Sequence, residues 1–408
     1  MQSPKRMYHA FVDDICLILI MSEQPNTKMD TAQKLTIIAD SNIASLDGFF
    51  NATTLGNHES RVVTIIKVAG RDITAQLLAE HQPDVLLIRS VTPINESLLA
   101  DNHSVQFVGS ATIGTDHVDQ AYLAERNICF ANAAGSSKHS VAQYVMTAIL
   151  TLHPEYGLQN VQSQATSKTS MASKHAQMTL GIIGLGNIGS TLARYATDLG
   201  WQILGYDPLL PPSKLNNASF EQVLQSDVVS LHVPLTSVDA SDYPTYHLID
   251  KAALQLMPAK TMLINSARGP VIDATALAAD IEQNNRQVVL DVFEQEPVVA
   301  ESLLNKLSLA TPHIAGYSLE GKLRGTQMIY DALCHEFDVT PKQAMQSLLP
   351  DNLYLWSELK AHPDRLIKFY DIEQDDKQLR SKVVDGEVSA SDFDQLRRDY
   401  HLRREWQF

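Results

Sequence analysis

Short apolar runs separated by polar turns recur along most of the chain, and their spacing predicts alternating strands and helices. The first set lies at residues 35–39, 62–68, 85–88 and 105–108, and the second at 180–183, 202–206, 228–231, 262–264, 288–292 and 307–310. Helical or loop segments separate these runs. Because strands that alternate with helices form parallel βαβ units, the pattern predicts an α/β fold with parallel sheets.

A glycine-rich turn follows the apolar run at 180–183. Gly184, Gly186 and Gly189 have G-x-G-x-x-G spacing, and apolar residues at helical spacing follow them until Gly200. In such a turn the first glycine permits a tight bend, the second lets the backbone approach a pyrophosphate, and the third lets helix and strand pack closely. Free N–H groups at the start of the helix then hold the anion.

The residue at the end of the second strand of this unit indicates which dinucleotide binds. Asp207 follows the run at 202–206, where a carboxylate can accept hydrogen bonds from the adenosine ribose hydroxyls. The same charge would repel the additional phosphate of NADP. The unit therefore predicts NAD as the cofactor.

Composition and charge exclude several classes of partner. The chain has 408 residues, of which 44% are hydrophobic, and a net charge of -15. These values are typical of a soluble globular protein of several domains, and without a long Lys/Arg run they argue against nucleic acid or a membrane as partner. The three cysteines are far apart, which favours reduced thiols in a cytoplasmic protein. We expect no metal, since neither clustered cysteines nor an H-E-x-x-H motif occurs.

Polar residues after several strands are candidates for contacts with a small substrate. Ser90 and Thr112 follow the runs at 85–88 and 105–108, and ligands of open α/β sheets bind beyond the carboxyl ends of strands. Ordinary turn and cap chemistry explains each of them equally well when it is taken alone.

Three charged or titratable residues follow strands of the second set and indicate the chemistry. His313 is a candidate general base, because imidazole titrates near neutral pH. Glu296 is a candidate partner that orients and stabilises the protonated ring, and Arg268 can grip a carboxylate through two parallel hydrogen bonds. Beside a nicotinamide cofactor, this set predicts oxidation of a 2-hydroxy acid.

The two ends of the chain and one internal interval differ from the rest. Residues 1–34 are expected to be a disordered or mis-started extension, and residues 159–177 an exposed loop or linker. From about residue 338 prolines punctuate the chain, and residues 391–406 are predicted to form a helix with Phe393, Leu396 and Tyr400 on one face. A stripe of this kind on so small a unit suggests packing against another surface.

Four segments, GLGNIG, NSARGPVID, LDVFEQEP and TPHIAG, resemble the D-specific 2-hydroxyacid dehydrogenase family over residues 35–337. The resemblance implies a flavodoxin-like substrate domain (35–137 and 314–337) into which a Rossmann NAD-binding domain (138–313) is inserted. It also implies that Arg268 binds the substrate carboxylate, that Glu296 pairs with the histidine, and that His313 is the catalytic acid/base.

A narrower resemblance, to one branch of that family, rests on RSVTPINESLL, SATIGTDHVD, HIAGYSLEGKLRGT and the tail. It implies a phosphorylated 2-hydroxy acid as substrate and a small α+β domain at 338–408 through which two copies form a homodimer. Substrate contacts would come from Ser90, Thr112 and Tyr317. Cofactor contacts would come from Gly184, Gly186, Asn187, Ile188, Gly189, Asp207, Val233, Asp291 and Gly316, although the family more often has Thr at the position of Val233.

Some alternatives stay open at this point. Arg89, Lys322 or Arg324, with help from the C-terminal arginines, are candidates for the substrate phosphate. The chain could instead be another D-2-hydroxyacid dehydrogenase, such as one acting on 3-phosphoglycerate, or an NAD-sensing interaction protein of the same fold.

Overall fold

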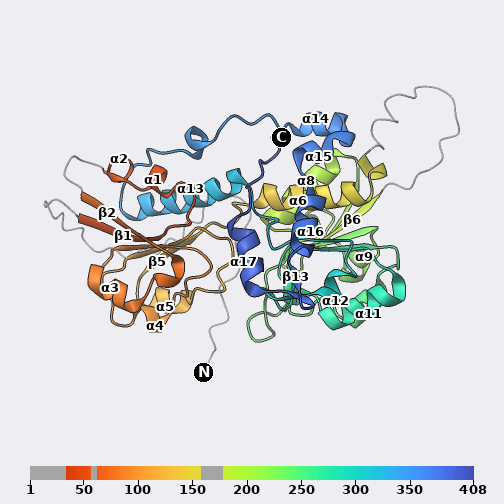
Figure 1. The fold of residues 1–408 in the computed structure, drawn as a ribbon, viewed down its shortest axis with the longest axis horizontal. Helices are drawn as coiled ribbons and strands as arrows, with labels where there is room; N and C mark the ends of the chain where they lie inside the picture. Colours follow the sequence, from red (N-terminus) through yellow and green to blue (C-terminus); the bar gives the residue numbers. More distant parts are fainter. Residues whose placement is uncertain (1–33, 57–61, 158–177) are drawn as a thin grey trace.

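The computed structural model describes residues 34–56, 62–157 and 178–408, which form two lobes with the tail lying across them (Figure 1). The interval 159–177 lies outside the described residues, and so does the expected N-terminal extension except for Lys34, which begins the first strand. Within the described part of the chain, no helix combines the length and the apolar character needed to cross a membrane. Of the three cysteines, Cys129 and Cys334 are free thiols, and Cys16 is not described.

The first lobe is built on a five-stranded parallel sheet in the order β2-β1-β3-β4-β5. Its strands are β1 (Lys34–Asp40), β2 (Val62–Val68), β3 (Val85–Ile88), β4 (Phe107–Ser110) and β5 (Cys129–Asn132). Around it lie α1 (Leu46–Phe49), α2 (Ala52–Leu55), η1 (Gly70–Asp72), α3 (Ala75–His81), α4 (Glu96–Leu99), α5 (Gln120–Glu125) and α13 (Leu319–Glu336). The strand order is that of flavodoxin-like folds, as expected.

Both faces of this sheet are covered, which explains its nearly continuous apolar strands. Ile37 packs with α1 and α13 on one face, whereas the next residue, Ile38, packs with α3, α4 and α5 on the other. Successive side chains of a strand point to opposite faces, so each strand serves two cores. Helix α13 follows the second lobe in sequence but covers the first, and the chain therefore crosses between the lobes again near residue 314 (Figure 1).

The second lobe is built on a six-stranded parallel sheet in the order β12-β10-β9-β8-β6-β7. Its strands are β6 (Thr179–Ile183), β7 (Gln202–Tyr206), β8 (Val228–Leu231), β9 (Met262–Asn265), β10 (Val288–Leu290) and β12 (Leu309–Ala310). The helices are α6 (Lys138–Leu152), α8 (Asn187–Asp198), α9 (Phe220–Leu224), α10 (Lys251–Leu256), η2 (Gly269–Val271), α11 (Ala274–Asn284) and α12 (Glu301–Leu304). Because β7 and β8 flank β6 on opposite sides, the sheet changes direction at β6, where ligands of such folds bind.

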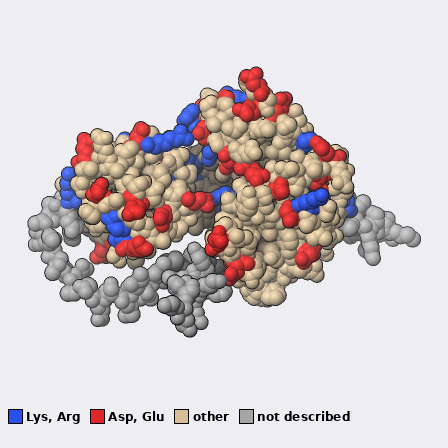
Figure 2. Space-filling view, turned by 90° about the horizontal axis from the view of Figure 1, so that it is seen from below, with Lys and Arg blue, Asp and Glu red and all other residues tan. Residues whose placement is uncertain are grey.

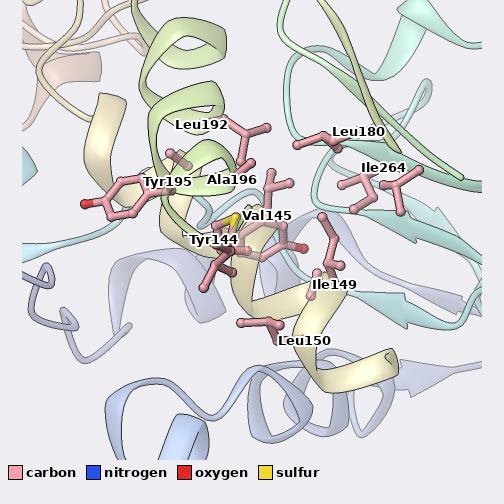
Figure 3. Close-up of a cluster of buried hydrophobic side chains, with 14 of the residues drawn as sticks. Tyr144, Val145, Ile149, Leu150, Leu180, Leu192, Tyr195, Ala196 and Ile264 are labelled. Carbon is pink, nitrogen blue, oxygen red and sulfur yellow. The ribbon is translucent and has the colours of Figure 1, made fainter. Parts of the chain in front are cut away.

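Helices α6 and α8 pack together on one face of this sheet. Tyr144, Val145 and Ile149 of α6 meet Leu192 and Ala196 of α8, and Leu180 and Ile264 of the sheet close the cluster (Figure 3). The side chain of Tyr144 is fully buried, and its hydroxyl lies 2.7 Å from Thr311 Oγ1. This core fixes β6, and with it the position of the glycine turn.

Most strands lie within one residue of the apolar runs that predict them, and three differ by two residues at an end. Strand β4 runs over Phe107–Ser110 instead of 105–108, because its pairing with β3 extends from Val85↔Phe107 to Ile88↔Ser110. Strand β10 stops at Leu290 instead of 292, since its partner β9 ends at Asn265. Strand β12 is limited to Leu309–Ala310 by its two-residue pairing with β10.

From Trp356 onward the tail packs onto the second lobe and shares its core, whereas Met345 belongs to the core of the first lobe. It contains η3 (Met345–Leu348), α14 (Trp356–Ala361), η4 (Pro363–Arg365), α15 (Leu366–Phe369), α16 (Ile372–Arg380), β13 (Val383–Val384), β14 (Glu387–Val388) and α17 (Ala390–Arg398). Trp356 and Trp406 are buried in the cluster around α6 and α8, and Phe393 in the cluster on the other face of the sheet. Strand β14 also pairs with β11 (Val299–Ala300) of the second lobe.

The predicted helix at 391–406 is wrong beyond Arg398. Helix α17 is capped by the Ser389 side chain and ends at Arg398, and the chain then runs in a non-helical conformation past α13. There Arg403 forms a bridge with Ser318, and Trp406 N donates to the side-chain oxygen of Gln143. These contacts with distant parts of the chain outweigh the helical pattern. Local sequence alone cannot reveal them.

Candidate active site

The turn after β6 has the geometry that a pyrophosphate needs. Gly184 has φ 94°, and a Cβ there would lie 2.6 Å from the carbonyl oxygen of His232. A Cβ at Gly189 would lie 2.0 Å from the carbonyl oxygen of Gly184, so only glycine lets helix and turn pack this closely. At Gly186, which caps α8, an added Cβ would meet no atom within 4 Å.

The space beside Gly186 is open, as the approach of a pyrophosphate to the backbone requires. Asn187 and Ile188 form the first turn of α8, whose N–H groups are free to bind an anion. Val233 lies beside the turn, because its Cγ1 is 3.0 Å from the position of a Cβ on Gly184. The described residues thus fit the dinucleotide predicted from the sequence.

Asp207 lies at the end of β7, directly beside the glycine turn. Its Oδ2 accepts a hydrogen bond from Leu185 N at 3.1 Å, and its Oδ1 accepts one from Leu209 N at 3.1 Å. Asn217 holds the backbone of Asp207 in place from the other side. A carboxylate fixed at this edge can accept the ribose hydroxyls of NAD.

Replacing Asp207 with asparagine removes this charge but keeps an oxygen that accepts backbone N–H groups. We expect the Kd for NADH to rise about 10-fold and the preference over NADPH to shrink, as measured by fluorescence titration. Asp250→Asn is the matched control, since Asp250 also accepts a backbone N–H, at the start of α10. An unchanged ratio of NADH to NADPH affinity in the Asp207 variant would contradict the assignment.

The candidate acid/base pair forms as the sequence predicts. His313 Nδ1 lies 2.9 Å from Glu296 Oε1, and both side chains are about one-third exposed or less, at 30% and 27%. His313 itself has φ 55°, a left-handed conformation that is uncommon for a residue other than glycine. Its Nε2 has no hydrogen-bond partner within the described part of the chain and remains available for a substrate proton.

Asp291 fixes the strained backbone that carries His313. Its carbonyl oxygen accepts from His313 N at 2.8 Å, and its carboxylate accepts from Ile314 N at 2.8 Å and Ala315 N at 2.9 Å. Thr311 donates a further hydrogen bond to the carboxylate at 2.6 Å. Burial raises the pKa of Asp291 to about 6, although His313 and these hydrogen bonds oppose the rise.

Glu296 is ionised because of its partner. Burial alone would raise the pKa of this carboxyl, but the hydrogen bond and charge of His313 and the N–H of Phe293 together hold it below its ordinary value of 4.5. A depressed pKa in the folded state contributes stability above the unfolded value, and this contribution is lost as the pH falls through the folded pKa. Near neutral pH Glu296 is therefore a carboxylate, and it faces Nδ1 of His313.

We expect Glu296→Gln to lower kcat by about 10²-fold and to move the acid limb of the pH profile of kcat/KM to lower pH. The amide can still hold the ring but no longer favours its protonated form. The profile is measured from pH 5 to 9 with the wild type alongside. Glu294→Gln is the control, because Glu294 also pairs with a histidine, His247, at 2.6 Å, outside the His313 pair. A pH profile that does not move would contradict the proposed role of Glu296.

Arg268 extends from the end of β9 to the first lobe. Its Nη1 donates to its neighbour Ala267 at 2.8 Å, and its Nη2 lies 3.4 Å from the carboxylate of Asp116. A Cβ on Gly114 would lie 2.3 Å from Nη2, so the guanidinium packs directly against the loop after β4 and would have to shift if residue 114 carried a side chain. Asp116 is 65% exposed, which leaves a substrate carboxylate able to take its place at the arginine.

The predicted substrate contacts lie on different parts of the first lobe and the crossing segment. Thr112 belongs to the loop that faces Arg268, since its hydroxyl donates to the carbonyl of Gly114 at 3.4 Å. Tyr317 lies in the crossing segment a few residues after His313. Gly316 beside it, a predicted cofactor contact, packs against Ser137, which precedes α6. Ser90 is exposed at the end of β3, and no contact joins it to the other residues of the set.

Sequence reasoning missed how the tail supports this site. Arg403 donates to the carbonyl oxygens of Ile314, at 2.9 Å, of Tyr317, at 3.2 Å, and of Ala315. It thereby holds the crossing segment that follows His313. The run of arginines near the C-terminus was the available signal, but nothing in it identified the carbonyl groups as partners.

Within the described residues, no group of three or more His, Cys, Asp or Glu side chains is arranged to hold a metal ion. The site described above consists of a dinucleotide turn, a histidine paired with a carboxylate, and an arginine that reaches the opposite lobe. This combination suits hydroxy-acid oxidation by a nicotinamide cofactor.

Comparison with known proteins agrees with this geometry. Residues 144–315 match the D-isomer specific 2-hydroxyacid dehydrogenase, NAD binding domain, and residues 358–408 match a domain of unknown function (DUF3410). The chain is 67% identical to the erythronate-4-phosphate dehydrogenase of Psychrobacter cryohalolentis, over 92% of this chain and 98% of the relative. It is 46% identical to the erythronate-4-phosphate dehydrogenase of Acinetobacter baylyi, over 91% of this chain and 98% of that relative.

Solved structures support the fold. A D-lactate dehydrogenase from Aquifex aeolicus, complexed with NAD and lactic acid, aligns with a TM-score of 0.57 at 23% identity, over 74% of this chain and 95% of that one. A glyoxylate reductase from Paecilomyes thermophila aligns with a TM-score of 0.59 at 23% identity, over 78% of this chain and 100% of that one. The expected Rossmann NAD-binding domain is confirmed, and the chain belongs to the erythronate-4-phosphate dehydrogenases, a branch of the D-isomer specific 2-hydroxyacid dehydrogenase family.

Proposed function

We propose that this chain oxidises 4-phospho-D-erythronate at C2 to (R)-3-hydroxy-2-oxo-4-phosphobutanoate, with NAD as the oxidant, in the biosynthesis of pyridoxal 5′-phosphate. The 67% identity to a dehydrogenase of this name supports the substrate. The observation that carries the reaction type is the pairing of His313 Nδ1 with Glu296 Oε1 at 2.9 Å, which leaves Nε2 free.

Arg268, His313 and Glu296 each have a separate role in the reaction. Arg268 binds the substrate carboxylate and so orients C2. His313 Nε2 accepts the proton of the C2 hydroxyl as the carbonyl forms, and Glu296 stabilises the imidazolium that results. NAD, held at the glycine turn and Asp207, would supply the acceptor for the C2 hydride.

The arrangement of domains supports a reaction between the lobes. We assign residues 35–137 and 314–337 to the substrate domain, 138–313 to the NAD-binding domain and 338–408 to a C-terminal domain. Arg268 belongs to the second of these and reaches Asp116 of the first, so the two together enclose the reacting carbon. Ser90, Thr112 and Tyr317 are the further contacts that we assign to the substrate.

We also propose that the chain acts in the cytoplasm as a homodimer formed through residues 338–408. Apolar side chains of this region are exposed, with Leu353 at 82%, Ile367 at 62% and Val384 at 65%. Such side chains favour burial against a second surface. Light scattering gives the mass directly, and the mass of a single chain at micromolar concentration would contradict the dimer.

The test of the function is the formation of NADH with purified protein, followed by absorbance. We expect turnover with 4-phospho-D-erythronate and NAD, and a kcat/KM at least about 10²-fold lower with 3-phosphoglycerate. A higher kcat/KM with 3-phosphoglycerate would favour the other dehydrogenase. Binding of NADH without turnover of either acid would favour an NAD-sensing protein.

A further inference from the structure

We propose that Arg89, Lys322 and Arg397 together bind the phosphate group of the substrate, beside the ring of Tyr317. The inference rests on the proposed function, since it assigns the end of the substrate opposite to the carboxylate. The three cations come from the end of β3, from the first turns of α13 and from α17 of the tail. The tail would thus supply one side of the substrate site.

Lys322 is a cation without a counter-ion. Its Nζ lies 3.7 Å from the ring centroid of Tyr317, and no carboxylate of the described chain pairs with it. Burial, together with the charges of Arg89 and Arg397, lowers the pKa of Lys322 to about 7. Like charges that face one another in a partly buried place are unfavourable until an anion binds between them.

Arg397 brings the tail to this place. Its guanidinium lies near the ring of Phe393, at 5.9 Å, and 3.6 Å from Asp394 in the same helix. Its Nε is buried and has no hydrogen-bond partner in the described structure. The charge of Arg397 acts on both Lys322 and Glu296, so its guanidinium lies near the lysine and near the catalytic pair.

Helix α17 is held in a position that brings Arg397 close to the first lobe. The helix lies between the two lobes (Figure 1), and Asp394 pairs across to Arg71 at 3.4 Å. Arg89 directly precedes Ser90 at the end of β3, and its guanidinium has no partner among the described residues. Figure 2 shows Lys and Arg side chains beside the hollow between the lobes, in a chain whose net charge is -15.

The other nearby arginines are already occupied. Arg324 pairs with Glu405 at 2.8 Å and donates to the carbonyl of Ser136, so it is not a phosphate ligand as one of the sequence alternatives suggested. Arg403 is bound to the carbonyls of the crossing segment, and Arg404 pairs with Glu320 at 2.7 Å. Arg89, Lys322 and Arg397 therefore retain N–H groups that can donate hydrogen bonds to a phosphate. A phosphate monoester, with close to two negative charges and three acceptor oxygens, suits three such donors.

The test compares a substrate that carries the phosphate with one that lacks it. Lys322→Met and Arg397→Gln each remove one cation, and Lys251→Met, at an exposed position of α10, is the control. We expect each site variant to raise the KM for 4-phospho-D-erythronate about 10- to 100-fold, while kcat/KM for D-erythronate changes less than about three-fold. Equal losses with both acids would overturn the proposal, and thermal unfolding checks that the variants fold.

Binding of inorganic phosphate to the NADH-saturated protein gives a second readout that needs no turnover. We expect phosphate to bind the wild type and the control alike, and each site variant at least about 10-fold more weakly. Failure of the wild type to oxidise 4-phospho-D-erythronate would count against the proposed function alone, because phosphate binding still reports on the cations. Equal phosphate affinity in wild type and site variants would overturn the inference.

Discussion

Replacing His313 with asparagine is expected to lower kcat by about 10³-fold while the Kd for NADH stays unchanged. Proton transfer by a positioned side chain contributes about 10²- to 10⁴-fold, and the amide cannot accept the hydroxyl proton. Asparagine is the appropriate substitution because His313 has φ 55°, and asparagine tolerates the left-handed conformation better than alanine does. The measurement is the initial rate of NADH formation at saturating substrate.

His335→Asn is the control for this variant, since His335 is exposed at the end of α13. It should have wild-type kinetics. If His313→Asn retained more than about one-tenth of the wild-type kcat, His313 could not be the base. A parallel loss of NADH affinity would instead point to collapse of the segment that Asp291 holds.

Arg268→Lys should lower kcat/KM by about 10²-fold or more, although the charge is kept. A guanidinium forms two parallel hydrogen bonds with a carboxylate, whereas an ammonium acts as a point charge at a different distance. The carboxylate would then hold C2 less accurately relative to His313, and misplacement by about 1 Å can cost 10²-fold in rate. The affinity for NADH should not change.

Arg365→Lys provides the comparison, because Arg365 also contacts a carboxylate, that of Glu358 at 2.9 Å, but on the half-exposed surface of the tail. We expect no kinetic effect there. Wild-type kcat/KM in Arg268→Lys would mean that the substrate carboxylate is bound by another group.

The second lobe could be predicted from the sequence because its signals are local. Gly184 and Gly189 are required by close backbone contacts, Gly186 leaves the backbone of the turn open, and Gly200, with φ 80°, ends helix α8 as expected. The strand ends placed Arg268 and His313 at one edge, since parallel strands share their carboxyl side. Because Glu296 also follows a strand that ends at this edge, its pairing with His313 could be predicted.

The tail could not be predicted in the same way, because its structure depends on distant partners. Residues 399–406 have a helical pattern, yet Arg403 finds the carbonyl groups of the crossing segment, and Trp406 stacks on Trp356 with ring centroids 5.6 Å apart. The cations of the proposed phosphate site could not be predicted for the same reason. Lys322 and Arg397 are far apart in sequence, and only the fold distinguishes them from Arg324, which Glu405 already occupies.

The most direct test of the account follows the hydrogen at C2. The protein is supplied with NAD and with 4-phospho-D-erythronate that carries deuterium at C2, and both products are analysed by mass spectrometry. The account predicts one deuterium in the reduced cofactor and none in the keto acid, because the C2–H bond is the one that breaks. Reduced cofactor without deuterium, or no reduced cofactor at all, would contradict it.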